Sequence, residues 1–244
     1  MKGVSPMLSQ FKVKEFVFQG RNAKILYPPC PANGKLILKT EYFSAFPYFE
    51  VAMLKKGYTL CFVSHPTRWA PDSETHVMAD FVRSVAAELG YEPKCIPVGM
   101  SCGGLQAVRL AELHPELVSV LFLDAPVLNL LSMAGLGACQ CKDVPKFWEE
   151  MVKTYGFTRS SIVNFRKSPI DDMQSLIQNN IPIIMLYGDA DDVVLYEENG
   201  KILEDYYLEH GGDIKVLRFP GRGHHPHSLE DPAPIMEFVE AHLD

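Results

Sequence analysis

Short apolar runs alternate with longer amphipathic stretches along most of the 244-residue chain. The short runs are rich in β-branched residues, which is typical of strands, whereas apolar residues three or four positions apart in the longer stretches indicate helices. This alternation predicts an α/β fold, in which helices cover both faces of a mainly parallel sheet. The predicted strands are 11–19, 21–27, 35–41, 58–64, 94–100, 118–124, 181–187 and 214–219.

The patterns of the individual runs indicate where each strand lies in the sheet. The first two alternate polar and apolar residues, as an antiparallel hairpin at a sheet edge would, while later strands are apolar throughout, as strands between two helical layers must be. A helix is predicted from 102 to 114, where Pro115 stops it. Further helices are predicted at 46–56, 72–89, 173–179, 200–210 and 233–242.

One long stretch, from 127 to about 170, breaks the alternation. It has no convincing strand, contains Pro145 and Pro169, and includes an amphipathic piece at 146–155. Its length exceeds that of an ordinary connection, and long excursions at the carboxyl ends of parallel strands commonly form lids or pocket walls. We therefore expect a single domain spanning 1–244 with a small helical cap inserted at about 127–170.

Composition and charge restrict the partners of the chain. The formal net charge is −7 and no basic stretch could neutralise a run of phosphates, so nucleic acid is not an expected partner. No apolar run is long enough for a membrane span, and the first ten residues lack the apolar core of a signal peptide, which favours a soluble, cytoplasmic protein. The six cysteines are scattered, which favours reduced thiols, and Cys139 and Cys141 are interpreted as incidental loop thiols.

The sequence Gly99-Met100-Ser101-Cys102-Gly103 lies between a predicted buried strand and a predicted helix, with no residue left for a loop. A serine on so abrupt a turn adopts strained backbone angles, and side chains two positions before and after it would collide, so glycine is needed there. The turn lifts the hydroxyl above the sheet edge, where the N–H groups of the helix N-terminus favour developing negative charge. Ser101 is therefore the candidate nucleophile.

A serine hydroxyl needs a base, and the base needs an orienting carboxylate. An acidic loop at 188–194 follows the seventh predicted strand, and His224 follows the eighth. Because the carboxyl ends of parallel strands meet at one edge of a sheet, we expect these groups near Ser101. The order of serine, aspartate and histidine matches hydrolases whose nucleophile occupies a strand-to-helix turn.

With these residues in this order, the chain resembles the α/β-hydrolase fold family over essentially its whole length, and serine esterases of the prolyl-oligopeptidase and carboxylesterase type within it. The resemblance implies eight strands, with the nucleophile after the fifth, an acid after the seventh and a histidine after the eighth. The acid of the family's G-x-x-D-x-x-V loop is Asp191 here, and the base of its G-x-G-H turn is His224. The implied catalytic residues are Ser101, Asp191 and His224.

Both partners of the serine have alternatives. The acid could instead be Asp189 or Asp192 in the same loop, or Asp124 after the sixth strand, and the base could be His225 or His227. The group of three histidines also suggests a metal site. However, an extended loop does not direct three imidazoles at one ion without help, so neither a metal nor a cofactor is expected.

An oxyanion hole would combine the backbone N–H of Cys102 with an N–H of Tyr42 or Phe43, just after the third strand. This segment departs from the His-Gly pattern of many family members. Together with the G-H-H-P-H ending, it resembles a subset of bacterial esterases. The residues expected to contact the substrate are Glu41, His65, Trp69 and Met100. A structural salt bridge for Glu41 and a packed loop around Trp69 are the alternatives.

The resemblance implies a serine hydrolase that cleaves a small or medium carboxylic ester through an acyl-enzyme, with an acylated sugar as one candidate substrate. Peptidases, thioesterases and carbon–carbon hydrolases use the same fold and groups, and a peptidase that trims chain ends would need a charged anchor such as Glu41. A non-catalytic ligand-binding module is the alternative from another class. The expected partner is thus a small-molecule ester, and the sequence leaves a homo-oligomer open.

Overall fold

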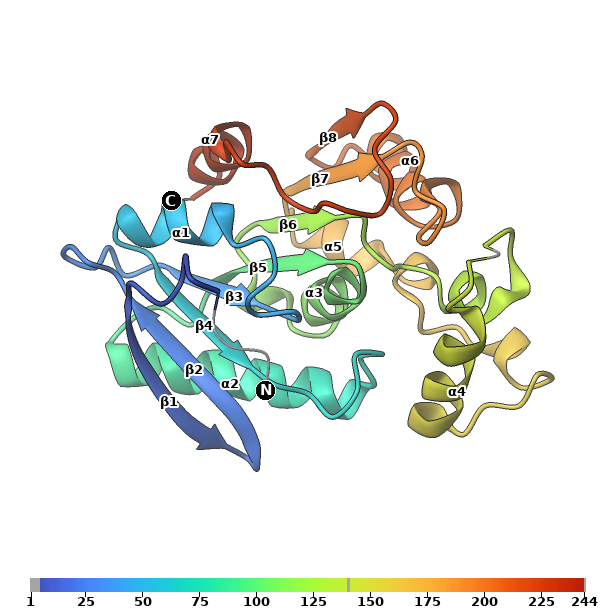
Figure 1. Cartoon of the computed structure of the whole chain (residues 1–244), viewed down its shortest axis with the longest axis horizontal. Helices are drawn as coiled ribbons and strands as arrows, with labels where there is room; N and C mark the ends of the chain where they lie inside the picture. Colours follow the sequence, from blue (N-terminus) through green and yellow to red (C-terminus); the bar gives the residue numbers. More distant parts are fainter. Residues whose placement is uncertain (1–4, 140, 244) are drawn as a thin grey trace.

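The computed structural model describes residues 5–139 and 141–243, and its centre is one eight-stranded sheet (Figure 1). The strand order is β1-β2-β4-β3-β5-β6-β7-β8. The pairs β1–β2 and β2–β4 are antiparallel, and all the other neighbouring strands are parallel. The strands are β1 Lys12–Phe18, β2 Arg21–Tyr27, β3 Leu36–Lys39, β4 Thr59–Val63, β5 Cys95–Met100, β6 Leu121–Asp124, β7 Ile183–Gly188 and β8 Ile214–Phe219. All eight predicted strands are confirmed, including the antiparallel hairpin at the edge.

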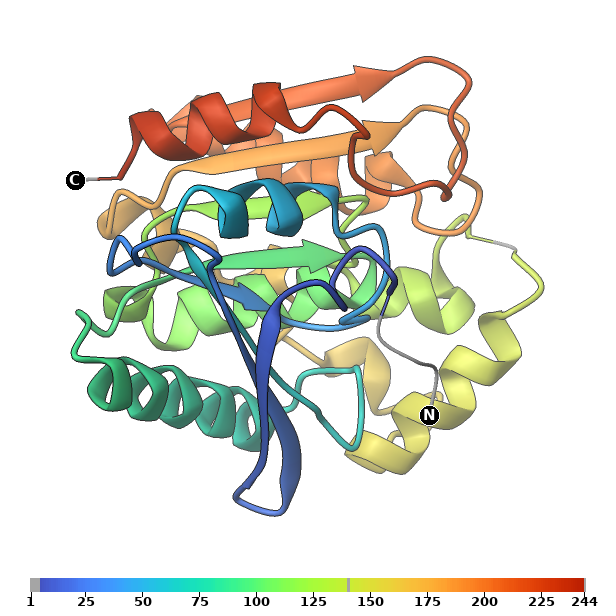
Figure 2. The same ribbon diagram turned by 60° about the vertical axis from the view of Figure 1, so that its left-hand side comes forward.

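Helices cover both faces of this sheet, as predicted. The helices α1 and α7 pack on one face, while α2, α3, α5 and α6 pack on the other (Figure 2). The helices are α1 Tyr48–Lys55, α2 Asp72–Leu89, α3 Cys102–Leu113, α4 Val144–Tyr155, α5 Gln174–Gln178, α6 Gly200–His210 and α7 Ala233–Ala241. None in the described part of the chain is long and apolar enough to cross a membrane.

Two apolar layers hold the helices on the sheet. On one face, Phe81 of α2 and Val108 of α3 are fully buried against the sheet. On the other face, the ring of Phe49 of α1 meets that of Phe122 of β6 edge-on, with centroids 5.2 Å apart. Fully burying one such side chain contributes about 1.5–3 kcal/mol. The central strands can be apolar on both sides because both faces are covered, and this matches the continuous apolar runs of their sequence.

The stretch from 127 to 170 lies beyond the carboxyl ends of the strands, around α4 (Figure 1). Within its described residues there is no strand, only α4 and short helical turns, of which η2 spans Ser132–Leu136, η3 spans Ile162–Asn164 and η4 spans Pro169–Asp171. Phe147 and Met151 of α4 are buried against Trp69 and Leu105 of the main body. The six cysteines are free, and the residue between Cys139 and Cys141 lies outside the described residues.

Candidate active site

Ser101 occupies an abrupt turn between β5 and α3, as predicted. Its φ of 53° and ψ of −122° lie in a region that non-glycine residues rarely adopt. Three backbone hydrogen bonds fix this strained residue: its N–H donates to the carbonyl of Asp124 (3.0 Å), and its carbonyl accepts from Gly104 and Val127 (2.9 Å each). The nucleophile candidate is therefore held by the strands and helix around it rather than by a flexible loop.

The glycines around Ser101 allow the close approach of backbone segments. A Cβ on Gly99 would lie 2.6 Å from the carbonyl oxygen of Gly103, and one on Gly103 would lie 3.1 Å from Thr40 Oγ1. The first distance is impossible for a real side chain and the second is tight. The predicted need for glycine on both sides of the serine is thus met, with Gly103 facing the segment after β3.

His224 connects the serine to a buried carboxylate. Its Nε2 lies 3.1 Å from Ser101 Oγ, and its Nδ1 lies 2.8 Å from Asp191 Oδ2. The other oxygen of Asp191 accepts the backbone N–H groups of Val193 and Val194, both at 2.9 Å. Burial alone would raise the pKa of Asp191, but the hydrogen bond and charge of His224, with the two N–H donors, hold that pKa below its usual range. The carboxylate is therefore ionised and oriented at neutral pH.

The three alternative acids have other partners. Asp189 binds Arg218 at 2.6 Å on the surface, and Asp192 is exposed. Asp124 is buried, but its carboxylate accepts the backbone N–H of Ser228 and lies 3.5 Å from the guanidinium of Arg222. Asp124 thus anchors the loop that carries His224, while Asp191 holds the imidazole itself.

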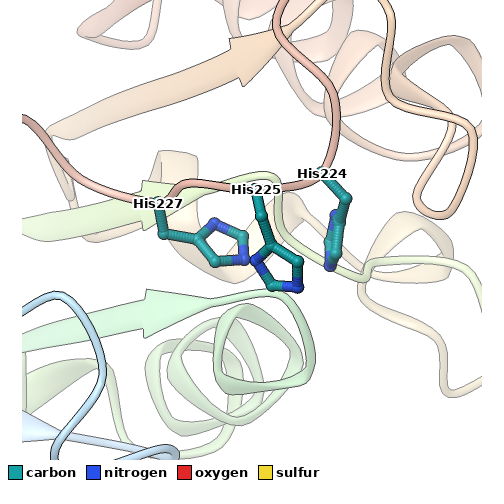
Figure 3. Close-up of side chains that lie close together, drawn as sticks. All are labelled: His224, His225 and His227. Atoms are coloured by element: carbon teal, nitrogen blue, oxygen red, sulfur yellow. The ribbon is translucent and has the colours of Figure 1, made fainter.

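The alternative bases, His225 and His227, also lie in this loop. Among the described residues, neither of them makes a hydrogen bond to Ser101. The ring of His225 stacks on Phe46 with centroids 6.0 Å apart, and His227 meets the same ring edge-on at 5.7 Å. Figure 3 shows that the three imidazoles nevertheless converge on one another. Among the three, His224 is the one placed to take a proton from Ser101.

The residues expected to form an oxyanion hole surround the same turn. Cys102 begins α3, so its N–H has no carbonyl partner within that helix. Burial raises the pKa of the Cys102 thiol to about 11, which leaves this neighbour of Ser101 unreactive at neutral pH. Across the turn, the hydroxyl of Tyr42 lies 3.3 Å from Arg68, and the ring of Phe43 packs on that of Phe62 with centroids 5.1 Å apart.

A pocket of about 550 Å³ lies between the loop after β4 and α4, and neither Ser101 nor His224 is among its lining residues. Glu41 and His65, two of the residues expected to contact the substrate, line this pocket together with Arg68 and Glu150. Glu41 also follows Thr40, which packs against Gly103 of the nucleophile turn. The carboxylate of Glu41 accepts a hydrogen bond from Gln106 at 2.8 Å, and no salt bridge to it is present among the described residues. The alternative of a structural salt bridge for Glu41 is therefore wrong.

Two of the predicted substrate contacts are wrong. Trp69 is completely buried, with its Nε1 donating to Glu150 at 3.0 Å and its ring against Phe147, so the packed-loop alternative holds. Met100 is 1% exposed and directs its sulfur to within 3.3 Å of the buried Lys39 ammonium. Because alternate residues of a strand face opposite sides of the sheet, Met100 points into the core.

Sequence reasoning missed Glu150 altogether. It lies on α4, and its carboxylate accepts hydrogen bonds from Arg68 (2.9 Å) and Trp69 in the loop after β4. On the sequence, Glu150 is one of several charges on an amphipathic helix, and nothing marks it as a contact with residues about 80 positions away. Only the fold brings this carboxylate to the pocket.

Comparisons with solved structures agree on the fold. An acylaminoacyl peptidase from Pyrococcus horikoshii aligns with a TM-score of 0.69 at 16% identity, over 96% of this chain and 42% of that one. A puromycin-hydrolyzing peptidase from Mycobacterium tuberculosis gives 0.72 at 12% identity, over 96% and 38%. An α/β hydrolase from the sediment metagenome of the Mar Chica lagoon, Morocco, gives 0.56 at 18% identity, over 94% and 96%.

These structures share the α/β-hydrolase fold, which confirms the predicted fold class. The chain spans less than half the length of the two peptidases but nearly all of the metagenomic hydrolase. A search of the curated proteins finds no significant match to the sequence. The model of the prolyl oligopeptidase family matches residues 76–244, well over half of the chain and including Ser101, Asp191 and His224. The protein therefore belongs to the prolyl oligopeptidase family.

Proposed function

We propose that this protein is a serine hydrolase that cleaves its substrate through a covalent acyl-enzyme. The observation that carries the proposal is the position of His224, which lies within hydrogen-bond distance of both Ser101 Oγ and Asp191. With Nδ1–H donated to Asp191, the lone pair of Nε2 faces the serine hydroxyl, and this is the tautomer that a general base requires. The family match supports the same chemistry.

In the proposed mechanism, Ser101 Oγ attacks the substrate carbonyl while its proton passes to His224 Nε2. The resulting imidazolium is stabilised by Asp191 and returns the proton to the leaving group, so that an ester oxygen departs as an alcohol. Water then attacks the acyl-enzyme with its proton taken by His224, and collapse of the second tetrahedral intermediate returns that proton to Ser101. No cofactor takes part in these steps.

The negative charge of each tetrahedral intermediate would be held by the N–H of Cys102 and by one from the segment after β3. Cys102 is suited to this role because it begins α3, where the helix dipole also favours an anion. Tyr42 and Phe43 are the candidates for the second donor, since Gly103 packs directly against the preceding residues Thr40 and Glu41.

A carboxylic ester with a small or medium acyl group is the substrate that we propose first. The pocket of about 550 Å³ between the loop after β4 and α4 shares Glu41 with the surroundings of the turn and is large enough for such a group. The charges in its wall are mostly satisfied, since Arg68 pairs with Glu150 and His65 lies against Glu74. A neutral polar substrate, such as an acylated sugar, would suit that wall.

Peptide-bond cleavage is the second candidate and is favoured by two observations. The family is named for peptidases, and two of the similar structures are peptidases by title. In addition, the carboxylate of Glu41 has a hydrogen bond to Gln106 but no cationic partner among the described residues, so it could bind a substrate amino group.

A labelling experiment tests the serine hydrolase. A fluorophosphonate should modify Ser101 stoichiometrically, and the modification should be absent from Ser101→Ala and His224→Ala. A folded wild-type protein that stays unlabelled would contradict the proposal and favour a ligand-binding module.

A second experiment separates the two substrates. Turnover of p-nitrophenyl esters is compared with that of aminoacyl anilides for the wild type and Glu41→Gln. Ester turnover that Glu41→Gln preserves supports the first candidate, whereas anilide turnover that this variant loses supports an exopeptidase.

A further inference from the structure

The loop after β8 brings three imidazoles together (Figure 3), and one of them, His224, lies 3.1 Å from Ser101 Oγ. The ring centroids of His224, His225 and His227 are 4.9 Å apart in every pair. One nitrogen from each ring lies within 4.8 Å of the other two. The three side chains thus lean toward one another although their residues follow one another along a single loop.

His227 is a buried polar group with no adequate partner. Its side chain is 4% exposed, and neither ring nitrogen makes a hydrogen bond among the described residues. Asp124 Oδ1 lies 3.5 Å from Nδ1 but makes no hydrogen bond with it, and the other oxygen of Asp124 accepts the N–H of Ser228. An unsatisfied buried nitrogen is costly, and it is explained if the ring serves a ligand that enters from the active site.

His224 already has the arrangement of a metal-binding histidine. Its Nδ1 faces the carboxylate of Asp191 at 2.8 Å, which leaves the lone pair of Nε2 directed outward toward Ser101. A carboxylate behind the imidazole orients metal-binding histidines in the same way and makes them more basic. The same lone pair can therefore accept either the serine proton or a metal ion.

We propose that His224 Nε2, His225 and His227 form a binding site for a divalent transition-metal ion of the Zn²⁺ type, and that the bound ion reversibly blocks the hydrolase. Three neutral imidazoles are typical ligands of such ions, with water or Ser101 Oγ available for the fourth position. Coordination uses the Nε2 lone pair, so the base can no longer take the serine proton. The inhibitory part of this proposal rests on the proposed function, and the binding part does not.

Metal binding requires the three rings to move closer together. Zinc–nitrogen bonds are about 2.1 Å, so two nitrogens of a tetrahedral site are about 3.4 Å apart. The limit of 4.8 Å among the three rings exceeds this by about 1.4 Å. His225 is exposed and stacks on Phe46 with ring centroids 6.0 Å apart, so its side chain is free to rotate toward the other two. Hard ions such as Mg²⁺ prefer oxygen ligands and should not bind here.

Other groups on the molecule could bind the same ions. His76 of α2 and His114, directly after α3, lie at the surface with ring nitrogens 2.8 Å apart. The free cysteines are further candidate ligands for zinc. A binding measurement must therefore distinguish the loop after β8 from these groups.

Binding is tested first on Ser101→Ala, which cannot turn over substrate. Co²⁺ is titrated and its visible absorption recorded, and Zn²⁺ is titrated by calorimetry. One equivalent should bind with imidazole-type bands and without a thiolate-to-cobalt band. Adding His225→Ala should weaken binding by at least about 10-fold, whereas adding His76→Ala, the matched control, should leave it within about 2-fold. Absence of binding, a thiolate band, or loss of binding only with His76→Ala would overturn the proposal.

Inhibition is then measured as the ratio of fluorophosphonate labelling rates with and without Zn²⁺. The wild type should be slowed by at least about 10-fold at saturating Zn²⁺, EDTA should restore the rate, and Mg²⁺ should have no effect. The ratio should return toward one in His225→Ala. Equal slowing of wild type and His225→Ala would refute the inhibitory role. A wild type that is never labelled would contradict the proposed hydrolase instead, while the cobalt titration would still decide the metal site.

Discussion

Replacing Asp191 with asparagine should slow acylation of Ser101 by about 10³-fold without unfolding the protein. The carboxylate lies 2.8 Å from His224 Nδ1, and its side chain is only 3% exposed. When His224 takes the serine proton, a full positive charge forms beside this buried negative charge. Asparagine is the same size but carries no charge, and its amide can favour the wrong imidazole tautomer.

The magnitude follows from Coulomb's law. Opposite unit charges about 4 Å apart attract by about 4 kcal/mol at an effective dielectric constant of about 20. Each 1.4 kcal/mol or so of lost transition-state stabilisation is tenfold in rate, which gives about 10³-fold. The measurement is the second-order rate constant of fluorophosphonate labelling, with the melting temperature recorded for each variant.

Two matched variants make this prediction specific. Asp189→Asn alters a carboxylate in the same loop that binds Arg218 at the surface, so its labelling rate should stay within about 3-fold of the wild type. Asp124→Asn removes an anchor of the histidine loop and should lower the melting temperature. A fully folded Asp191→Asn that labels at the wild-type rate, or an Asp189→Asn that is equally slow, would refute the assignment of the acid.

Three further predictions concern stability. Lys39→Met leaves the carboxylate of Glu50 buried without its cation, so urea unfolding should show a loss of about 3–5 kcal/mol, which adding Glu50→Leu should largely reverse. Gly99→Ala places a Cβ 2.6 Å from backbone and should cost about 1–3 kcal/mol, whereas Gly223→Ala, with its nearest neighbour at 3.7 Å, should be tolerated in the same assay. Burial alone would raise the pKa of Glu74, but hydrogen-bonded arginine and histidine partners hold it below its usual range. The ionised Glu74 therefore stabilises the fold above its usual pKa, and this stabilisation is lost as the pH falls through the lowered pKa. In Glu74→Gln, the free energy of unfolding should therefore decline less steeply on acidification. A decline as steep as that of the wild type would contradict this.

The fold could be predicted closely because its signals are local. Each buried strand is a continuous apolar run, and each helix has a stripe of apolar residues, so the eight strands and their order along the chain followed from the sequence. The observed ends of these elements differ from the predicted ones by at most three residues; β6, for example, begins at Leu121 rather than at residue 118. Hydrogen bonding between neighbours, which apolar patterning does not encode, decides where a strand begins.

The residues next to Ser101 could be predicted for a different reason. The nucleophile turn imposes glycines at fixed offsets, and parallel topology delivers Asp191 and His224 to the same sheet edge. What the sequence did not decide was which acid in that region turns toward the histidine. That choice depends on the backbone N–H groups of Val193 and Val194, which accommodate one carboxylate oxygen and leave the other facing His224.

The pocket wall could not be predicted, because it is made between elements far apart in sequence. Glu150 on α4 binds Arg68 and Trp69, which follow β4, so one carboxylate both closes the wall and buries the tryptophan expected to face the substrate. The arrangement of Ser101, Asp191 and His224 is thus set by short-range rules, whereas the proposed substrate would be selected by the packing of α4 on the loop after β4. A change of substrate can therefore arise from substitutions in α4 without any change in the three residues that would act on the bond.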